Sequence, residues 1–249
     1  LSKAKEEKFL GLVTGDDEPY SFFYDSDDLD DFDPSNSITY KEHRLCISVS
    51  RQQFVNSRPS GPYVRSLQFF ATTDAYPRCP YNVSFISKNF KLLKVLDLEA
   101  INMGSSFADG IDSLIQLIFL AVGGDIDSIP SSLANLRNLE TLLVKGLKGK
   151  KVLLPESIWR MTSLRHVHVK NNASFTLQPK VTGIGFQLKN LVSLSVPSLI
   201  FGEDADEMIR MLPNLRELSC IFSKSRGSRD YYQFPRLEKL TQLESLKIV

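Results

Sequence analysis

Leucines and other aliphatic residues recur along this chain in one spacing, LxxLxxLxL, which is most complete between residues 129 and 146. In that stretch, IPSSLANLRNLETLLVKG, the spacing is carried by Leu136, Leu139, Leu142 and Val144. The closing LxL has the two-residue period of a strand with one buried face, and the three-residue steps before it suit a turn leading into that strand. One unit of this length cannot bury its own leucines. Stacked units can, because each lays its strand beside the previous one.

The first residue of each LxL pair marks one copy of this unit. Nine copies occur, and successive copies lie 22 to 29 residues apart. This is the leucine-rich repeat period, loosened by insertions, and chance apolar spacing in a helical domain does not explain nine matches. The sequence therefore predicts an α/β leucine-rich repeat solenoid, or horseshoe, with a parallel β-sheet on the concave face and short helices or irregular turns on the convex face. The marker residues are Leu45, Leu67, Leu96, Leu120, Leu142, Val167, Leu194, Leu218 and Leu246.

The pattern divides the chain into a pre-repeat linker, residues 1–41, and a leucine-rich repeat domain of about nine repeats, residues 42–249. Within the linker, residues 2–12 resemble the tail of a helix. The acidic stretch GDDEPYSFFYDSDDLDDFDP follows, with no Lys or Arg between Lys8 and Lys41. Like charges at this density resist burial, so a solvated linker is the main interpretation. Its interleaved aromatic residues leave open a second one, in which the stretch docks on a basic surface.

The segments between the predicted strands are short and amphipathic, which places them on the convex side. One of them, LPESIWRM, contains Ile158, Trp159 and Met161, and we expect these side chains to pack rather than to bind a ligand. The chain begins at Leu1 rather than at a methionine, so we expect this sequence to be a piece of a longer protein. No polar cap follows the last predicted strand, so either the protein continues or the last unit is itself the cap.

Composition narrows the functional classes. The net charge of +1 argues against a dedicated nucleic-acid binder, and no apolar run is long enough to cross a membrane. Cys46, Cys79 and Cys220 are odd in number and far apart, and we assign Cys46 and Cys220 to core positions of their repeats. This usage favours a reducing, cytoplasmic compartment. The N-x-S sequons at Asn82 and Asn172 keep a secreted protein open as an alternative.

The search for catalytic and metal-binding motifs is negative. The segment GLKGKK at residues 146–151 does not have the spacing of a phosphate-binding loop. His166 and His168 point to the same side of a predicted strand, but no third metal ligand lies in phase with them. No nucleophile and base form a pair. We therefore predict no catalytic, cofactor or metal site in this chain, and no enzyme activity.

The solenoid instead predicts an interaction surface, because residues beside the core leucines stack into rows across the sheet. The basic part of this surface would accept an acidic partner, including another domain of the same protein. The alternative is a solvated face whose charges only keep the sheet soluble. The partner-binding candidates are Asp97, Glu99, Glu140, Lys145, Arg165, His166, His168, Lys170 and Arg216.

Three segments together, IPSSLANLRNLETLLV, LPESIWRMTSLRHVHV and FKLLKVLDLEAINM, resemble the leucine-rich repeat region of plant intracellular nucleotide-binding leucine-rich repeat (NLR) immune receptors. The similarity is greatest to the coiled-coil class of nightshade-type plants, with a helper subtype left open. The resemblance implies an upstream ATPase switch that binds ADP or ATP, none of whose nucleotide-contacting residues falls on this chain. It also implies that the repeats hold this switch inactive and help to sense a pathogen effector or another immune receptor.

The resemblance further implies a cytoplasmic disease-resistance receptor that oligomerises on activation, associates with the plasma membrane in some cases, and acts in immune cell death. Two other functions remain alternatives. A substrate-recruiting adaptor of a ubiquitin ligase predicts an F-box upstream in place of the nucleotide-binding module. A secreted receptor ectodomain predicts glycans on Asn82 and Asn172.

Overall fold

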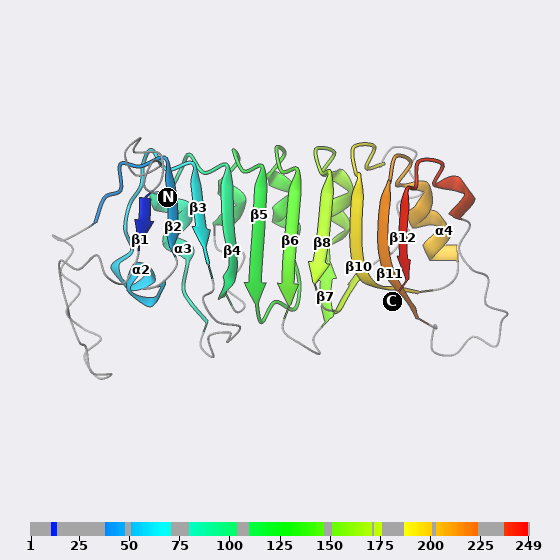
Figure 1. Ribbon diagram of the computed structural model, residues 1–249, viewed down its shortest axis with the longest axis horizontal. Helices are drawn as coiled ribbons and strands as arrows, with labels where there is room; N and C mark the ends of the chain where they lie inside the picture. The colour runs from blue at the N-terminus through cyan, green and yellow to red at the C-terminus, as the bar shows by residue number, and fades with distance from the viewer. Residues whose placement is uncertain are drawn as a thin grey trace.

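The strands of this protein lie side by side in one parallel sheet that runs the length of the molecule (Figure 1). The computed structural model describes residues 11–13, 38–47, 51–70, 80–103, 110–146, 151–170, 172–175, 187–200, 203–223 and 237–248. The acidic stretch and Cys79 lie outside these residues. The main run of the sheet consists, in spatial order, of β1 (Gly11–Val13), β2 (Arg44–Ile47), β3 (Ser66–Phe69), β4 (Val95–Asn102), β5 (Phe119–Gly124), β6 (Thr141–Gly146), β8 (His166–Lys170), β10 (Ser193–Ile200), β11 (Glu217–Ser223) and β12 (Ser245–Ile248).

The marker residues of all nine predicted repeats form one continuous row across this sheet. Leu45 pairs with Leu67, the row continues strand by strand, and Leu218 pairs with Leu246 at its far end. The insertions that vary the repeat length therefore lie outside the paired segments. The predicted leucine-rich repeat fold, with its parallel sheet, is confirmed.

The N-terminal edge of the sheet differs from the sequence-based expectation. β1 pairs in parallel with β2, so that Leu12 lies beside Cys46. The predicted helix tail is therefore wrong for Gly11 and Leu12, because these residues gain backbone partners by extending the sheet. The boundary between linker and repeats at residue 42 stays a prediction.

Short helices cover one face of the sheet, which is the convex side, and leave the concave face open (Figure 1). Pro130 and Pro155 directly precede two of them, with φ of −69° and −72°, the value that the proline ring imposes. In both cases the proline carbonyl accepts the first hydrogen bond of the turn, from Leu133 N and Ile158 N. The helices are α2 (Arg51–Ser57), α3 (Ser84–Asn89), η3 (Ile111–Ser113), η4 (Ser131–Asn135), η5 (Glu156–Arg160), α4 (Glu203–Arg210) and η6 (Leu237–Lys239).

The core lies between the sheet and these helices and runs along the solenoid. Trp159 and Met161 are 5% and 3% exposed and Ile158 is 1% exposed, so their predicted packing role is confirmed. Near the N-terminal end, aromatic rings replace leucines, and Phe54 contacts the ring of Phe69 edge-on at 5.3 Å between centroids. Each fully buried aliphatic side chain stabilises the fold by about 1.5–3 kcal/mol relative to exposure.

Two features depart from the simple repeat pattern. β7 (Lys151–Leu154) and β9 (Asn172–Phe175) pair in parallel beside the main run, and β9 also pairs with β10 at Ser198. Cys46 lies between two core positions and pairs with Gln68, so its assignment to a core position is wrong. Cys46 and Cys220 are nevertheless both buried as free thiols. Burial raises the pKa of Cys220 to about 11.

No helix in the part of the chain that the structure describes is long and apolar enough to span a lipid bilayer.

Candidate functional site

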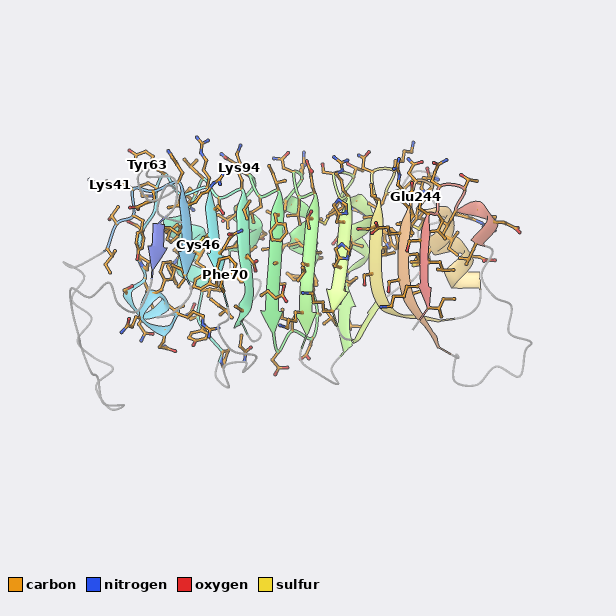
Figure 2. All side chains as sticks on the ribbon, in the orientation of Figure 1. Lys41, Cys46, Tyr63, Phe70, Lys94 and Glu244 are labelled. Atoms are coloured by element: carbon orange, nitrogen blue, oxygen red, sulfur yellow. The ribbon has the colours of Figure 1, made fainter. Side chains whose placement is uncertain are left out.

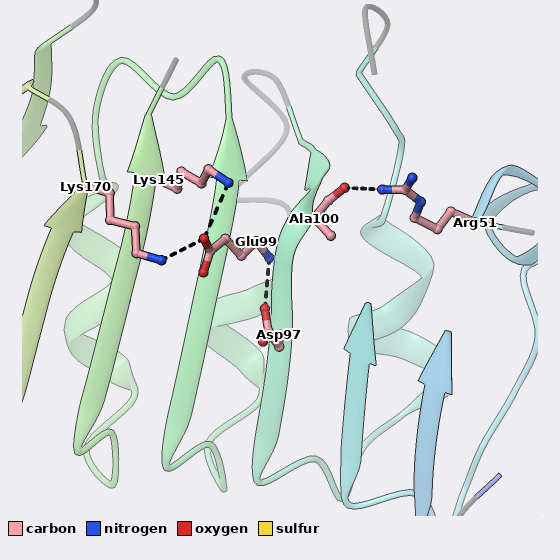
Figure 3. Close-up of polar contacts among 6 residues, drawn as sticks. All are labelled: Arg51, Asp97, Glu99, Ala100, Lys145 and Lys170. Carbon is pink, nitrogen blue, oxygen red and sulfur yellow. Dashed lines mark hydrogen bonds and ion pairs between the residues drawn. The ribbon is translucent and has the colours of Figure 1, made fainter. Parts of the chain in front are cut away.

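Four charged residues of the concave face form one cluster, the concave cluster: Asp97, Glu99, Lys145 and Lys170. The Glu99 carboxylate accepts a hydrogen bond from Lys170 Nζ at 2.8 Å, and Lys145 Nζ lies 3.5 Å from the same oxygen (Figure 3). Asp97 Oδ1 accepts a hydrogen bond from the Glu99 backbone N–H at 3.0 Å. The cluster thus joins side chains from three strands, β4, β6 and β8.

A β-bulge in β4 carries Glu99 into this position. The register between β4 and β5 shifts between Leu98 and Asn102, which leaves residues 99–101 without direct partners in β5. Bulges redirect side chains relative to the regular pleat. The guanidinium of Arg51, on α2, donates to the Ala100 carbonyl at 2.8 Å and anchors this bulge (Figure 3). Between Glu99 and Lys145, β5 contributes Gly123, which has no side chain to separate them.

The concave cluster balances two carboxylates against two ammonium groups. Burial raises the pKa of Asp97, while the hydrogen bond from Glu99 N–H acts in the opposite direction. The Lys145 and Lys170 side chains remain 38% and 51% exposed, whereas that of Glu99 is 23% exposed. The lysines predicted as a basic patch are therefore paired within the chain but still accessible. The arrangement suits a partner with both charge signs better than a purely acidic one.

His166 and His168 lie next to this cluster with parallel rings, 6.3 Å apart between centroids. The Ser193 hydroxyl lies between them, 2.7 Å from His166 Nδ1 and 3.2 Å from His168 Nε2, and Ser193 is 2% exposed. Burial, followed by the proximity of His166, lowers the pKa of His168. Among the described residues, no three His, Cys, Asp or Glu side chains are grouped to hold a metal ion.

The other three predicted residues, Glu140, Arg165 and Arg216, lie elsewhere. They belong to the strand-start edge, the row of residues two positions before each marker residue. Their backbones are linked there: Arg165 N donates to Glu140 O at 2.8 Å, Val192 N donates to Arg165 O at 2.7 Å, and Arg216 N donates to Val192 O at 2.9 Å. All three line a groove of about 680 Å³ at this edge. The structure thus divides the predicted surface into a concave cluster and an edge groove.

The sequence analysis did not identify several polar residues that lie at these sites. Ser193 reads as an ordinary strand residue, and nothing in its spacing indicates the two histidines beside it. A repeated signal does exist at the edge, where a polar residue precedes the second leucine of the LxxLxxLxL spacing in several units. Each of these side chains donates to a backbone carbonyl of the preceding repeat: Asn138 to Ile115, Ser163 to Arg137, Asn190 to Thr162 and Asn214 to Lys189.

Comparisons with known proteins agree with the repeat architecture. Residues 64–249 match the family model described as a leucine-rich repeat region. A putative late blight resistance protein homolog, R1B-16 of Solanum demissum, is 41% identical over 145 residues, covering 56% of this chain and 11% of that protein. Late blight resistance protein R1-A of the same species is 33% identical over 199 residues, covering 75% of this chain and 15% of that protein. The predicted resemblance to the repeat region of plant disease-resistance receptors is confirmed.

This chain spans about a tenth to a sixth of the length of the curated relatives it matches. Among solved structures, the internalin InlF of Listeria monocytogenes superimposes with a TM-score of 0.50 and 14% identity, covering 84% of this chain and 61% of that one. At this identity the likeness concerns the fold alone.

Proposed function

Because this chain belongs to the leucine-rich repeat region family, we propose that it is the protein-interaction and autoregulatory region of a cytoplasmic plant disease-resistance receptor. The names of its Solanum demissum relatives support the link to disease resistance. In this proposal an upstream module binds ADP or ATP, and the repeats contact that module within the same protein. A pathogen effector or another immune receptor is the second partner.

The observation that carries the proposal is the convergence of Lys145 and Lys170 on Glu99 in the concave cluster. Ions that are already held in place by one another lose little conformational freedom when a partner binds. The upstream module has an active and an inactive state, and only one of these states would present complementary charges to the concave cluster. Differential affinity for the inactive state keeps the switch closed, and a ligand that competes for the cluster releases it.

Charge reversal in the full-length receptor tests this mechanism. Lys145→Glu together with Lys170→Glu places three acidic side chains around one point, and we expect cell death in leaf tissue without a pathogen. The matched control is Lys88→Glu, an exposed lysine on α3, which should leave the receptor silent until it is challenged. A double variant that is expressed at the normal level, silent and normally inducible would contradict the autoregulatory role.

A binding assay between this chain and the nucleotide-binding segment encoded upstream examines the same contact directly. We expect tighter binding in ADP than in ATP, and weaker binding as NaCl rises, because salt screens exposed charges. The double variant should lose this binding while Lys88→Glu retains it. Absence of binding in both nucleotide states would refute the intramolecular contact.

A further inference from the structure

We propose that the strand-start edge between β5 and β11 binds an extended acidic segment of another protein, with an apolar residue of that segment lying against β5. This site is separate from the concave cluster, and the inference does not depend on the autoregulatory role proposed above. Figure 2 shows this edge along the top of the view, where the side chains of Lys94 and Glu244 project.

The groove at this edge has an excess of positive charge. Its volume is about 680 Å³, and three cationic side chains face one carboxylate in its lining. Cations spaced along a groove attract a chain that carries several carboxylates. The lining residues are Glu140, Ser163, Arg165, Lys189, Asn190, Val192, Asn214, Arg216 and Gln242.

These cations are available to a partner. Among the described residues, neither Arg165 nor Lys189 forms an ion pair, and both are exposed. Arg216 contacts Glu244 at 3.5 Å, but the two side chains are 55% and 67% exposed. An exposed pair of this kind contributes little to stability, so a carboxylate of the partner can replace Glu244.

Side-chain hydrogen bonds hold the floor of the groove in place. Ser163 Oγ donates to the Arg137 carbonyl at 2.6 Å, and Asn190 Nδ2 donates to the Thr162 carbonyl at 2.8 Å. Asn214 Nδ2 donates to the Lys189 carbonyl at 2.7 Å, which connects the loop that carries this lysine to the next repeat. Preorganised groups of this kind reduce the ordering cost of binding.

An apolar surface adjoins the cationic part of the edge. Ile115 and Ile118 are 62% and 37% exposed, although both belong to a residue type that is usually buried. Ile118 O accepts from Glu140 N, and Glu140 O accepts from Arg165 N, both at 2.8 Å. Two strand spacings therefore separate Ile118 from Arg165, which is roughly 10 Å. An extended peptide covers this distance in about three residues.

A peptide fits these features better than a nucleic acid does. The lining contains no aromatic side chain on which a base would stack. A phosphate backbone also has no group that would cover Ile115 and Ile118. The peptide that matches both the apolar surface and the cationic groove therefore has a leucine-like residue. About three residues later it has a run of spaced aspartates or glutamates.

Fluorescence anisotropy with the full chain tests the site. The probe is a labelled synthetic peptide with one leucine followed by three aspartates spaced by glycines. We expect binding at 50 mM NaCl that weakens at least tenfold at 300 mM, because the contacts are between exposed charges. Arg165→Glu combined with Lys189→Glu should weaken binding at least tenfold at the lower salt concentration.

The matched control is Arg65→Glu, which changes an exposed arginine at the same repeat position, directly before β3 and outside the groove. It should bind within twofold of the wild type, and thermal melts should show that all variants are folded. Ile118→Ser, which removes the apolar side chain without adding a charge, should weaken binding of the leucine peptide but not of a peptide with glycine in place of leucine. Equal loss in Arg65→Glu and in the double variant, or equal binding of an oligouridylate, would overturn the proposal.

Discussion

Leu142 in β6 and Leu246 in β12 occupy the same position of their repeats, yet their surroundings differ completely. Leu142 is 0% exposed and Leu246 is 41% exposed, and the next core position repeats the contrast, with Val144 at 0% and Ile248 at 51%. β6 has a strand on each side, β5 and β8, whereas β12 pairs only with β11 among the described strands. The contribution of a repeat leucine is thus set by its neighbouring repeats and not by its own unit.

The last repeat is only partly packed. Leu240, in the turn before β12, is 4% exposed, and Leu243 packs against the core. The strand that follows has all four residues exposed. In an array whose stability is a sum over neighbouring units, a strand with a partner on one side opens before a strand with partners on both sides.

We expect the greatest loss of stability at Leu142, the interior position. Leu142→Ala should lower the free energy of unfolding by about 2–5 kcal/mol, because it removes fully buried apolar area and leaves a cavity. Urea unfolding of the purified chain, followed by circular dichroism, measures this loss. A loss below about 1 kcal/mol would show that the interior repeats are loosely packed and would remove the contrast with β12.

We expect a smaller change in stability from pH, through His168 in the interior of the sheet. The pKa of His168 lies below its ordinary value of 6.5 in the folded chain, because burial and His166 oppose its protonation and Lys170 acts in the same direction, while Glu217 acts against them. The unfolded chain therefore binds more protons below pH 6.5. The contribution of neutral His168 to the free energy of unfolding is therefore fully present above pH 6.5. It is lost as the pH falls towards the lowered pKa.

Urea midpoints at pH 7.5 and pH 5.5 measure this dependence. His168→Gln should reduce the difference between the two midpoints, and His43→Gln, which changes an exposed histidine at the other end of the sheet, should not. If both variants behave alike, the environment of His168 is not the cause of the pH dependence.

The smallest effect is expected at the open end. Leu246→Ala should lower the free energy of unfolding by less than about 1 kcal/mol, because much of the side chain is already exposed. The same urea experiment, run beside Leu142→Ala, provides the comparison. Equal losses at the two positions would mean that β12 is covered in solution by a surface that buries Leu246.

The repeat pattern was sufficient to predict the parallel sheet, the register of its nine marker residues and the packing of η5. These features follow from local spacing, since a two-residue period can bury its leucines on only one face of a strand. The pattern was not sufficient for Cys46, which is buried between core positions, or for β1, whose partner strand is far away in the sequence. The surroundings of Cys46 and the pairing of β1 both depend on neighbouring strands, which the spacing within one repeat does not specify.

The candidate site likewise has features that the sequence predicts and contacts that it does not predict. Alternation within each strand assigns every residue to one face, so it predicts that charged residues gather beside the core leucines. The contacts between those charges arise only in the folded solenoid. Glu99 reaches Lys145 and Lys170 through a bulge in β4 and past a glycine in β5, and Ser193 joins His166 to His168. Such contacts connect residues from different repeats, and their geometry depends on the bulge in β4 and on side-chain positions that no local spacing specifies.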